Sequence, residues 1–301
     1  MLHKPLKRGA CLLLLCLIGC MLLSVSATAL SGATSHLTRV EKHPTAFPDR
    51  TAASYPAIAV YTDTGKTIRG RLLGDTTYVA VRDMAEAYGA AVSYRADTRC
   101  ATVTFKDLTM SVTDGGYVIY ANGRPLFTEC PAVILSDGKL YAPIRPMAKA
   151  FGVSVAWNGA SRTVSLRGPV RPLLPAEDFY REDEVYWLSR IISAESRGEP
   201  LLGQIAVGSV VLNRKNSRDY PATIYGVIFD RRGGVQFTPA QNGTVYATPH
   251  PDSVLAAKIC LEGYTVSDKV LFFLEPSKST SSWVPRNRTY VFSIGHHDFY
   301  A

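Results

Sequence analysis

Glu195 combines a carboxyl group with apolar neighbours, a setting that suits a side chain for acid catalysis. Between residues 182 and 196, apolar side chains recur at helical spacing, and acidic residues stand in the first turn, where the helix dipole favours them. Those apolar positions are Val185, Leu188, Ile191 and Ile192. Glu195 follows Ile191 by four residues and therefore continues the same stripe. Loss of water raises the pKa of such a carboxyl from about 4.3 towards neutrality, so Glu195 would hold a proton that it could donate.

A structural interpretation of Glu195 is also open, because a glutamate at a helix end can pair with Arg197 or with another nearby arginine. The following segment, residues 201–214, is apolar nearly all round its helical projection. That composition predicts a helix buried at the centre of a domain.

The rest of the C-terminal region predicts further elements around this pair of helices. Residues 235–246 form a loop dense in amide and aromatic side chains. A third helix is expected over residues 253–262, behind Pro251, with Asp252 or Ser253 as its cap and Gly263 as its end. Strand-like runs follow, and after them comes the segment HHDFYA, residues 296–301.

Four motifs in this order resemble the catalytic domain of the SleB and CwlJ cell wall hydrolases. They are A-E-x-R-G-E-P, G-Q-x-A-V-G-x-V-V-L-N-R, Q-F-x-P-x-x-N-G and I-G-x-H-x-F-Y, and they cover about residues 185–301. Those enzymes act on peptidoglycan, notably that of the spore cortex. The resemblance implies a mainly helical, reduced lysozyme-like domain in which the glutamate of the first motif, Glu195, is catalytic.

The resemblance also implies a reaction similar to that of lytic transglycosylases. Most glycosidases need two carboxylates, but here Glu195 would protonate the oxygen leaving N-acetylmuramic acid. It would then accept the proton of that sugar's own C6 hydroxyl, which closes a 1,6-anhydro ring. The alternatives are a hydrolytic muramidase, an N-acetylmuramoyl-L-alanine amidase and a non-catalytic wall-binding protein.

Several other residues are candidates for holding the glycan. Gln236, Asn242 and Tyr246 are expected substrate ligands, since amides bind acetamido and hydroxyl groups and aromatic rings lie against sugar faces; a loop held by its own hydrogen bonds is the other interpretation. His297 matches the terminal histidine of the family and is also assigned to substrate binding. His296 precedes it, and adjacent residues of an extended chain point to opposite sides, so the two are not expected to share a metal.

No metal or cofactor is expected, because the sequence contains no HExxH and no paired CxxC, which leaves little support for a zinc amidase. The expected partner is the glycan strand of peptidoglycan and not nucleic acid; accessory germination or wall proteins stay open.

Two further acids need an interpretation. Glu199 follows Gly198 and precedes Pro200, so it is predicted to be a turn or capping acid, with a catalytic partner as the alternative. Family members more often carry Tyr and Asn where this chain has Leu274 and Glu275. That departure makes Glu275 a candidate second carboxylate and keeps the non-catalytic alternative open.

A duplicated module precedes the catalytic region. Residues 78–94 (YVAVRDMAEAYGAAVSY) realign with residues 141–157 (YAPIRPMAKAFGVSVAW) at a constant offset, 141 − 78 = 63. Each half predicts a strand, a short helix closed by Gly89 or Gly152, and two strands with a turn near Asp97 or Asn158. The two halves are expected to share one core, because one alone is too small to bury much apolar area.

This module resembles the copper amine oxidase N-terminal-like domain over about residues 57–167. Met84 and Met147 are expected to pack rather than bind copper, and the segment has no histidine. Arg82 and Arg145 recur; a structural ion pair is the preferred interpretation, with anionic glycan groups as the alternative. The resemblance implies a wall-facing or spacer module.

The predicted fold class is α+β with two domains, a duplicated small αβ module followed by the mainly helical catalytic domain. The expected organisation is a signal peptide over residues 1–29, a linker over 30–54, the module over 55–168, a proline-rich linker over 169–180 and the catalytic domain over 181–301.

The N-terminal segment up to Ala29 has the pattern of an export signal. Basic residues precede an apolar run over residues 10–25, which ends at Ala27-Thr28-Ala29, a small-x-small cleavage signature. We expect a secreted protein of the cell wall or spore cortex; anchoring through an uncleaved signal or a lipidated Cys20 is the alternative. The whole chain has 33 basic and 25 acidic residues, and cleavage after Ala29 would leave a net charge of +5, which suits an anionic wall.

Three of the six cysteines lie outside the signal: Cys100, Cys130 and Cys260. Their odd number excludes a fully paired intramolecular framework. Cys100 and Cys130 are the candidate pair, and Cys260 on the third predicted helix is expected to be a buried small apolar residue.

Overall fold

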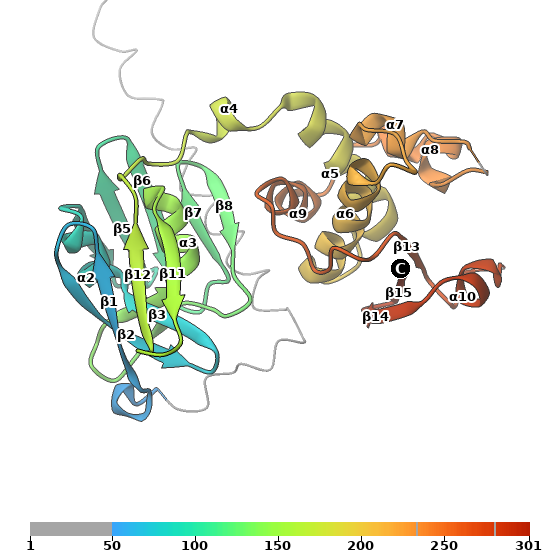
Figure 1. Ribbon diagram of the computed structural model, residues 1–301. Helices are drawn as coiled ribbons and strands as arrows, with labels where there is room; N and C mark the ends of the chain where they lie inside the picture. Colours follow the sequence, from blue (N-terminus) through green and yellow to red (C-terminus); the bar gives the residue numbers. More distant parts are fainter. Residues whose placement is uncertain (1–49, 233, 280) are drawn as a thin grey trace, which may run out of the picture. The chain divides into compact units, whose positions relative to one another are not determined.

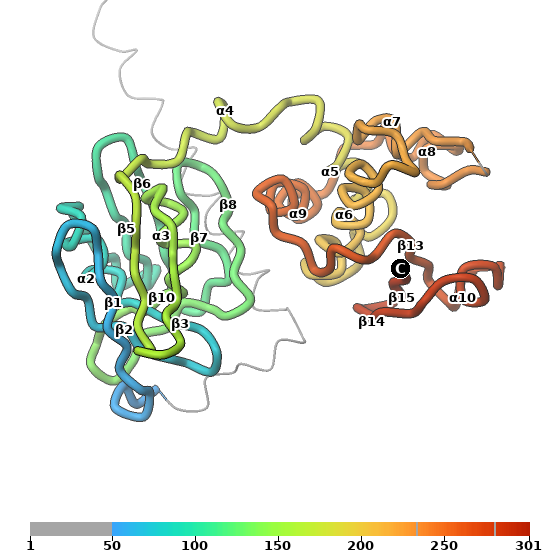
Figure 2. Tube along the Cα trace, in the orientation of Figure 1, coloured from blue at the N-terminus to red at the C-terminus, as the bar shows by residue number. Residues whose placement is uncertain are grey.

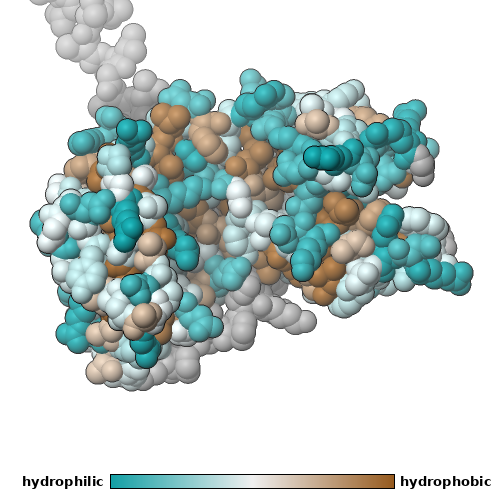
Figure 3. All heavy atoms as spheres, viewed as in Figure 1, coloured by the Kyte–Doolittle hydropathy of each residue, from teal (hydrophilic) through white to brown (hydrophobic). Residues whose placement is uncertain are grey.

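The computed structural model describes residues 50–232, 234–279 and 281–301 (Figure 1). The expected signal peptide, Cys20 and residues 30–49 of the first expected linker lie outside these ranges. No helix within the described ranges is long and apolar enough to cross a membrane. On the face drawn in Figure 3, hydrophilic and intermediate residues alternate with apolar patches.

Two sheets form the N-terminal module. One has seven strands in the order β11-β12-β1-β2-β3-β10-β9, and the other has five in the order β4-β5-β6-β7-β8. All neighbouring strands pair antiparallel except β1 and β12, which are parallel. The strands are β1 (Ala57–Thr62), β2 (Thr67–Leu73), β3 (Thr76–Ala80), β4 (Ala91–Arg95), β5 (Cys100–Phe105), β6 (Leu108–Thr113), β7 (Val118–Ala121), β8 (Arg124–Phe127), β9 (Val133–Ile134), β10 (Leu140–Pro143), β11 (Ser154–Asn158) and β12 (Thr163–Arg167).

The elements of this module recur at the offset seen in the sequence. Helix α2 (Val81–Ala87) corresponds to α3 (Ile144–Phe151), and β4 corresponds to β11. Strands β3 and β10 pair antiparallel, and Val79 lies opposite Ala142, its own counterpart in the second half. The two halves are therefore related by a local twofold axis that passes between these two residues. Met84 and Met147 are fully buried in the shared core, as expected.

The segment expected to be a proline-rich linker is bound to the module along much of its length. The backbone N–H of Arg171 donates to Phe151, and that of Leu173 donates to Ala150. The side-chain amide of Asn122 donates to the carbonyl of Leu173 at 2.7 Å. A short helix, α4 (Ala176–Phe179), follows. Paired backbone groups of this kind make the segment part of the packed structure rather than a free tether.

The C-terminal region is built on three helices that lie together in Figures 1 and 2. They are α5 (Glu182–Ser196), α6 (Leu201–Asn216) and α9 (Pro251–Leu261). The shorter elements are α7 (Ile224–Ile228), α8 (Thr238–Asn242), η2 (Thr244–Tyr246), α10 (Trp283–Asn287), β13 (Phe272–Leu274), β14 (Tyr290–Ile294) and β15 (His297–Tyr300). These last three strands form a sheet in the order β13-β15-β14.

Helix α6 is the buried central helix that its composition predicts. Gly208 is the point of closest approach to its neighbours. A Cβ at this position would lie 2.7 Å from Sγ of Cys260 on α9 and 2.9 Å from Ile192 on α5. The absent side chain therefore lets both helices pack directly on the α6 backbone. Cys260 is buried, as expected.

Two expectations need correction. Helix α9 begins at Pro251, and its cap is His250, whose ring accepts a hydrogen bond from the backbone N–H of Asp252. Proline at the first helical turn is favoured because no intrahelical partner is lost there. Cys100 and Cys130, the candidate disulfide pair, are both free thiols.

Candidate active site

Glu195 lies in the last turn of α5, half-buried beside fully buried Ile191 and Ile192. Burial raises the pKa of its carboxyl to about 7, and the positive charge of Arg214 acts in the opposite direction. Within the described residues this carboxyl forms no hydrogen bond or salt bridge, so the expected alternative, a structural pair with Arg197, is not formed. Near neutral pH the group is divided between its acid and carboxylate forms, which suits a residue that must donate and then recover a proton.

Arg214, in the last turn of α6, is the cation that acts on Glu195. Only 4% of its surface is exposed. Its Nε donates to the carbonyl of Leu271 at 2.7 Å, whereas its buried Nη1 has no hydrogen-bond partner. A guanidinium group fixed in this way retains a donor for an oxygen that acquires negative charge nearby.

An aromatic cluster covers the same helix towards its start. Trp187 precedes Glu195 by eight residues, or about 12 Å along the axis. Its ring lies within 4.9–6.0 Å of four other rings, centroid to centroid. These belong to Tyr186, Tyr225, Phe229 and Tyr246. Tyr225 and Tyr246 are more than half exposed, so the cluster offers aromatic surface to a ligand that extends along α5 from the acid.

The two predicted amide ligands are engaged in their own loop. Gln236 donates weakly to the carbonyls of Arg232 and Gly234, at 3.4 and 3.3 Å. Oδ1 of Asn242 accepts from the backbone and hydroxyl of Thr244, at 3.0 and 2.8 Å. Their contact with a sugar would require these bonds to be shared or exchanged. The assignment of both residues to substrate binding stays a prediction. The hydrogen bonds agree with the alternative interpretation, in which the loop is held by its own contacts.

His297 is nearly fully buried, and its assignment to substrate binding stays a prediction. It is 5% exposed, its ring packs against Phe273, and its buried Nδ1 has no hydrogen-bond partner. That atom lies 3.7 Å from Oε1 of Glu199, and Nδ1 of His296 lies 2.9 Å from the same oxygen. The two histidine rings thus reach one carboxylate instead of diverging, because His296 belongs to the turn before β15 and not to an extended chain.

Glu199 holds the hairpin of β14 and β15 against the start of α6. Besides its contact with the His296 ring, its Oε2 accepts the backbone N–H of His296 at 3.0 Å. A Cβ on Gly295 would fall 1.7 Å from that oxygen, and Gly295 has φ +59°. This carboxylate therefore anchors a turn that admits only glycine, in line with the predicted structural role of Glu199.

Glu275, the candidate second carboxylate, is bound by its neighbours. It accepts hydrogen bonds from Lys278 and Ser277, both at 2.8 Å, and these contacts lower its pKa. Among the described carboxyl groups, Glu195 alone has a resolved upward shift in pKa. In the same ranges no three His, Cys, Asp or Glu side chains are grouped as metal ligands.

Arg214 is the site residue that sequence reasoning overlooked. A basic residue in the last turn of a helix is ordinarily explained by the helix dipole. The available signal was its place at the end of an otherwise apolar helix, where a charge needs a specific partner.

Two families match this sequence. Residues 198–300 match the family described as Cell Wall Hydrolase, and residues 67–166 match the Copper amine oxidase N-terminal domain. Both resemblances inferred from the motifs are thereby confirmed. The first matched range begins three residues after Glu195.

Individual relatives agree with the first family. The chain is 35% identical over 120 residues to a spore cortex-lytic enzyme of Bacillus cereus, covering 40% of this chain and 45% of the relative. It is 27% identical over 111 residues to the cell wall hydrolase CwlJ of Oceanobacillus iheyensis, covering 35% and 77%. The catalytic domain of the germination-specific lytic transglycosylase SleB from Bacillus anthracis is 33% identical, with 42% of this chain and all of that chain covered and a TM-score of 0.37. The chain thus spans less than half the length of the spore cortex-lytic enzyme.

Proposed function

We propose that this chain, whose residues 198–300 match the cell wall hydrolase family, cleaves the glycan strands of peptidoglycan as a lytic transglycosylase. The relative named as a spore cortex-lytic enzyme supports a wall-cleaving activity. The observation that carries the proposal is the half-buried, unbonded carboxyl of Glu195 with its pKa of about 7. The wall or spore cortex outside the cell is the place where such a substrate is found.

In the proposed reaction, Glu195 donates its proton to the oxygen that joins C1 of N-acetylmuramic acid to N-acetylglucosamine. The C1–O bond breaks as the C6 hydroxyl oxygen of the same muramic acid bonds to C1. The hydroxyl proton passes to the Glu195 carboxylate, which returns to its acid form. No water molecule and no second carboxylate take part, in keeping with the engagement of Glu275 and Glu199 by other partners.

Arg214 acts as a positioning residue in this scheme. When Glu195 gives up its proton, a negative charge forms in a site from which water is largely excluded. The buried guanidinium stabilises that charge without changing place, because its Nε is held by Leu271. The exposed rings of Tyr225 and Tyr246 would lie against sugar faces of the strand.

Two architectural details belong to this proposal. The packing of α5, α6 and α9 supports a reduced lysozyme-like domain, in which the acid is carried at the end of a helix. The recurrence of equivalent strands and helices at a constant offset supports a duplicated N-terminal module.

The test is digestion of purified sacculi and spore cortex by wild type and Glu195→Gln, with products identified by mass spectrometry. Wild type is expected to release muropeptides with 1,6-anhydro ends, and the variant is expected to lose at least about a hundredfold in rate, the usual scale of acid–base catalysis. Glu182→Gln is the matched control, since it makes the same change at the exposed start of α5.

Other products would replace the proposal with one of its rivals. Reducing ends would identify a muramidase that uses water. Free stem peptides, lost when a chelator is added, would identify an amidase. Binding with no released fragment would identify a wall-binding protein. Full activity of Glu195→Gln would show that Glu195 is not the catalytic acid.

A further inference from the structure

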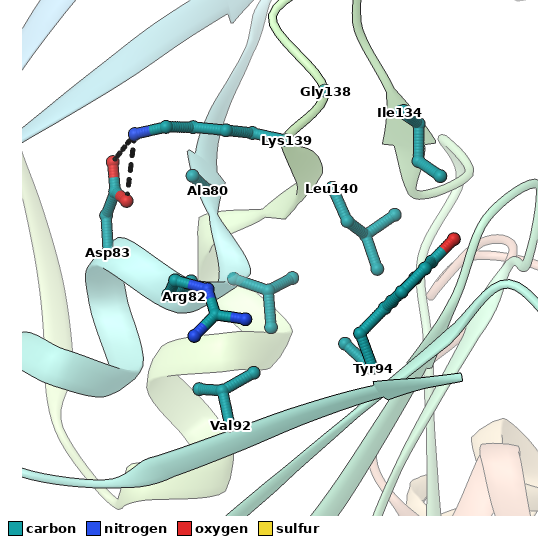
Figure 4. A pocket seen from close by; sticks show the side chains of 11 residues that line it. Ala80, Arg82, Asp83, Val92, Tyr94, Ile134, Gly138, Lys139 and Leu140 are labelled. Atoms are coloured by element: carbon teal, nitrogen blue, oxygen red, sulfur yellow. Dashed lines mark hydrogen bonds and ion pairs between the residues drawn. The ribbon is translucent and has the colours of Figure 1, made fainter. Parts of the chain in front are cut away.

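Two cavities, of about 400 and about 540 Å³, are lined by residues of the N-terminal module, and the second is also lined by Tyr264 of the C-terminal region. Both fall in the range of about 300–1,000 Å³ that is usual for ligand pockets. The first lies at the start of α2, over β4 and β5, and is closed by residues 138–140 of the other half (Figure 4). The second lies at the start of α3, over β11 and β12, and is closed by residues 75–77.

The two cavities are equivalent under the sequence offset that relates the halves. Of the eleven residues lining the first, seven at positions 80–101 match residues lining the second at positions 143–164. Three more, at positions 138–140, match positions 75–77. The matched side chains include Arg82 with Arg145, Val92 with Val155, and Tyr94 with Trp157. Each cavity is thus assembled from both halves of the module, as the pairing of Val79 with Ala142 requires.

Each cavity presents an aromatic ring and an arginine around an apolar wall. Tyr94 is 44% exposed and Trp157 is 46% exposed, on the outermost strands β4 and β11. Packing in the core does not explain why the two aromatic rings at equivalent positions are both exposed to this extent. Figure 4 shows Arg82 and Val92 together on one side of the first cavity and Tyr94 on the other.

Of the two recurring arginines, only Arg82 forms the structural ion pair that the sequence favoured, and that pair is long and exposed. Arg145 forms no salt bridge within the described residues. Arg82 reaches Glu86 only at 3.8 Å, with both side chains more than half exposed, a contact that contributes little. Lys139, in contrast, is bound to Asp83 at 2.8 Å (Figure 4). In the first cavity, therefore, Arg82 is the cation available to a ligand.

We infer that the two cavities are binding sites for one peptidoglycan strand, an inference that rests on the proposed function. A sugar face would lie on the ring of Tyr94 and another on Trp157. Arg82 would hold a carboxylate of the peptide-bearing muramic acid, since a guanidinium binds carboxylates with two parallel hydrogen bonds.

The second cavity takes an uncharged sugar. It contains Asp75 and Glu129 beside Arg145, so a second carboxylate would meet two negative charges. An N-acetylglucosamine unit has only hydroxyl and acetamido groups, which can form hydrogen bonds with Asp75, Glu129 and Arg145 and leave a sugar face for the apolar wall. Because both cavities bind the same polymer, the second binding event is intramolecular, and the affinity for a long strand exceeds that for a short fragment.

The experiment uses the full chain carrying Glu195→Gln, so that the ligand is not consumed. Cosedimentation with purified sacculi is measured for this protein and after Tyr94→Ala, Trp157→Ala and the two together. Each single change is expected to weaken binding at least about tenfold, and the double change at least about a hundredfold, because avidity commonly contributes 10²–10⁴-fold. Tyr61→Ala is the matched control: it removes an equally exposed ring (47%) from β1, outside both cavities.

Soluble ligands test the assignment of each cavity. By calorimetry, a peptide-bearing muropeptide should lose affinity on Arg82→Gln, and an N-acetylglucosamine hexamer should lose affinity on Trp157→Ala but not on Arg82→Gln. Circular dichroism checks that every variant is folded. Unchanged binding of sacculi by the folded double variant would overturn the inference, and so would an equal loss in the Tyr61→Ala control.

The outcome is separable from that of the proposed reaction. Binding is measured in the chain that carries Glu195→Gln, so it does not depend on whether the assigned acid cleaves the strand. If wild type released no fragments but the double variant still lost binding, the proposed reaction would fail while the two binding sites stood.

Discussion

At the scale of single residues, the protonation of Glu195 is set by two opposing effects. Burial against α5 and α6 disfavours the carboxylate, and the guanidinium of Arg214 favours it. Burial is the larger effect, so the pKa of Glu195 lies at about 7. Arg214 therefore keeps a desolvated acid within the range where it can both lose and regain a proton.

This balance predicts the pH dependence of cleavage. The proposed reaction needs protonated Glu195, so kcat/KM on a soluble glycan should fall about tenfold per pH unit above a midpoint near 7. Arg214→Met removes the charge that lowers the pKa of Glu195, so this midpoint should move to higher pH while the maximal rate falls. The measurement is a pH–rate profile between pH 5 and 9.

Arg197→Met is the control for that profile, because Arg197 is an exposed arginine at the end of the same helix. It should leave the midpoint in place. A midpoint that moved to lower pH in folded Arg214→Met would contradict the assigned interaction.

At the scale of elements, the turn between β14 and β15 depends on the contact between Gly295 and Glu199. Gly295→Ala would place a Cβ where the Glu199 carboxylate lies, and its φ of +59° adds backbone strain. We expect a loss of about 2–4 kcal/mol in the free energy of unfolding, measured with urea, and detachment of the hairpin from α6.

Gly263→Ala measures the effect of backbone strain without a steric clash of the new Cβ. Gly263 also has a positive φ, of +92°, but a Cβ there meets nothing within 4 Å. It should lose only about 1 kcal/mol, the cost of a strained alanine. Equal losses in the two variants would show that the contact with Glu199 does not matter.

At the scale of the whole molecule, Glu262 at the end of α9 joins residues that are distant in sequence. It accepts hydrogen bonds from Arg124 at 2.7 and 2.9 Å, from Lys149 at 2.8 Å and from Tyr180 at 2.6 Å. The Arg124 and Glu262 side chains are only 4% and 2% exposed. Although burial acts to raise the pKa of Glu262, these donors outweigh it and hold the pKa below its usual value.

Arg124→Ala is therefore expected to lower the free energy of unfolding by about 3 kcal/mol near neutral pH, since it breaks a buried pair. A carboxylate with a lowered pKa stabilises the folded state above its unfolded pKa of 4.5 and loses this effect as the pH falls through its folded value. The difference between wild type and variant, measured by urea unfolding, should thus shrink in acid below pH 4.5.

Arg95→Ala is the matched control: it removes a salt bridge whose partners are about two-thirds exposed, and it should leave the free energy of unfolding nearly unchanged at any pH. A constant difference between wild type and Arg124→Ala from pH 3 to 7 would contradict the electrostatic role of Glu262.

Features that depend on neighbouring residues could be predicted from the amino-acid sequence. Helical spacing placed Glu195 on an apolar face, the uniform apolarity of residues 201–214 placed α6 at the centre, and the internal repeat located α2 and α3. These follow from periodicities that act over one or two helical turns, or from direct comparison of two segments.

Contacts between groups that are distant in sequence could be learned only from the folded chain. In the folded chain, the charge of Arg214 acts on Glu195, and the rings of His296 and His297 both lie near the Glu199 carboxylate. His250 takes the place of the expected cap of α9. Each cavity of the module is completed by residues from the other half. No local pattern encodes such contacts, because they arise when whole faces of helices and sheets are buried together and the side chains at their edges must find partners.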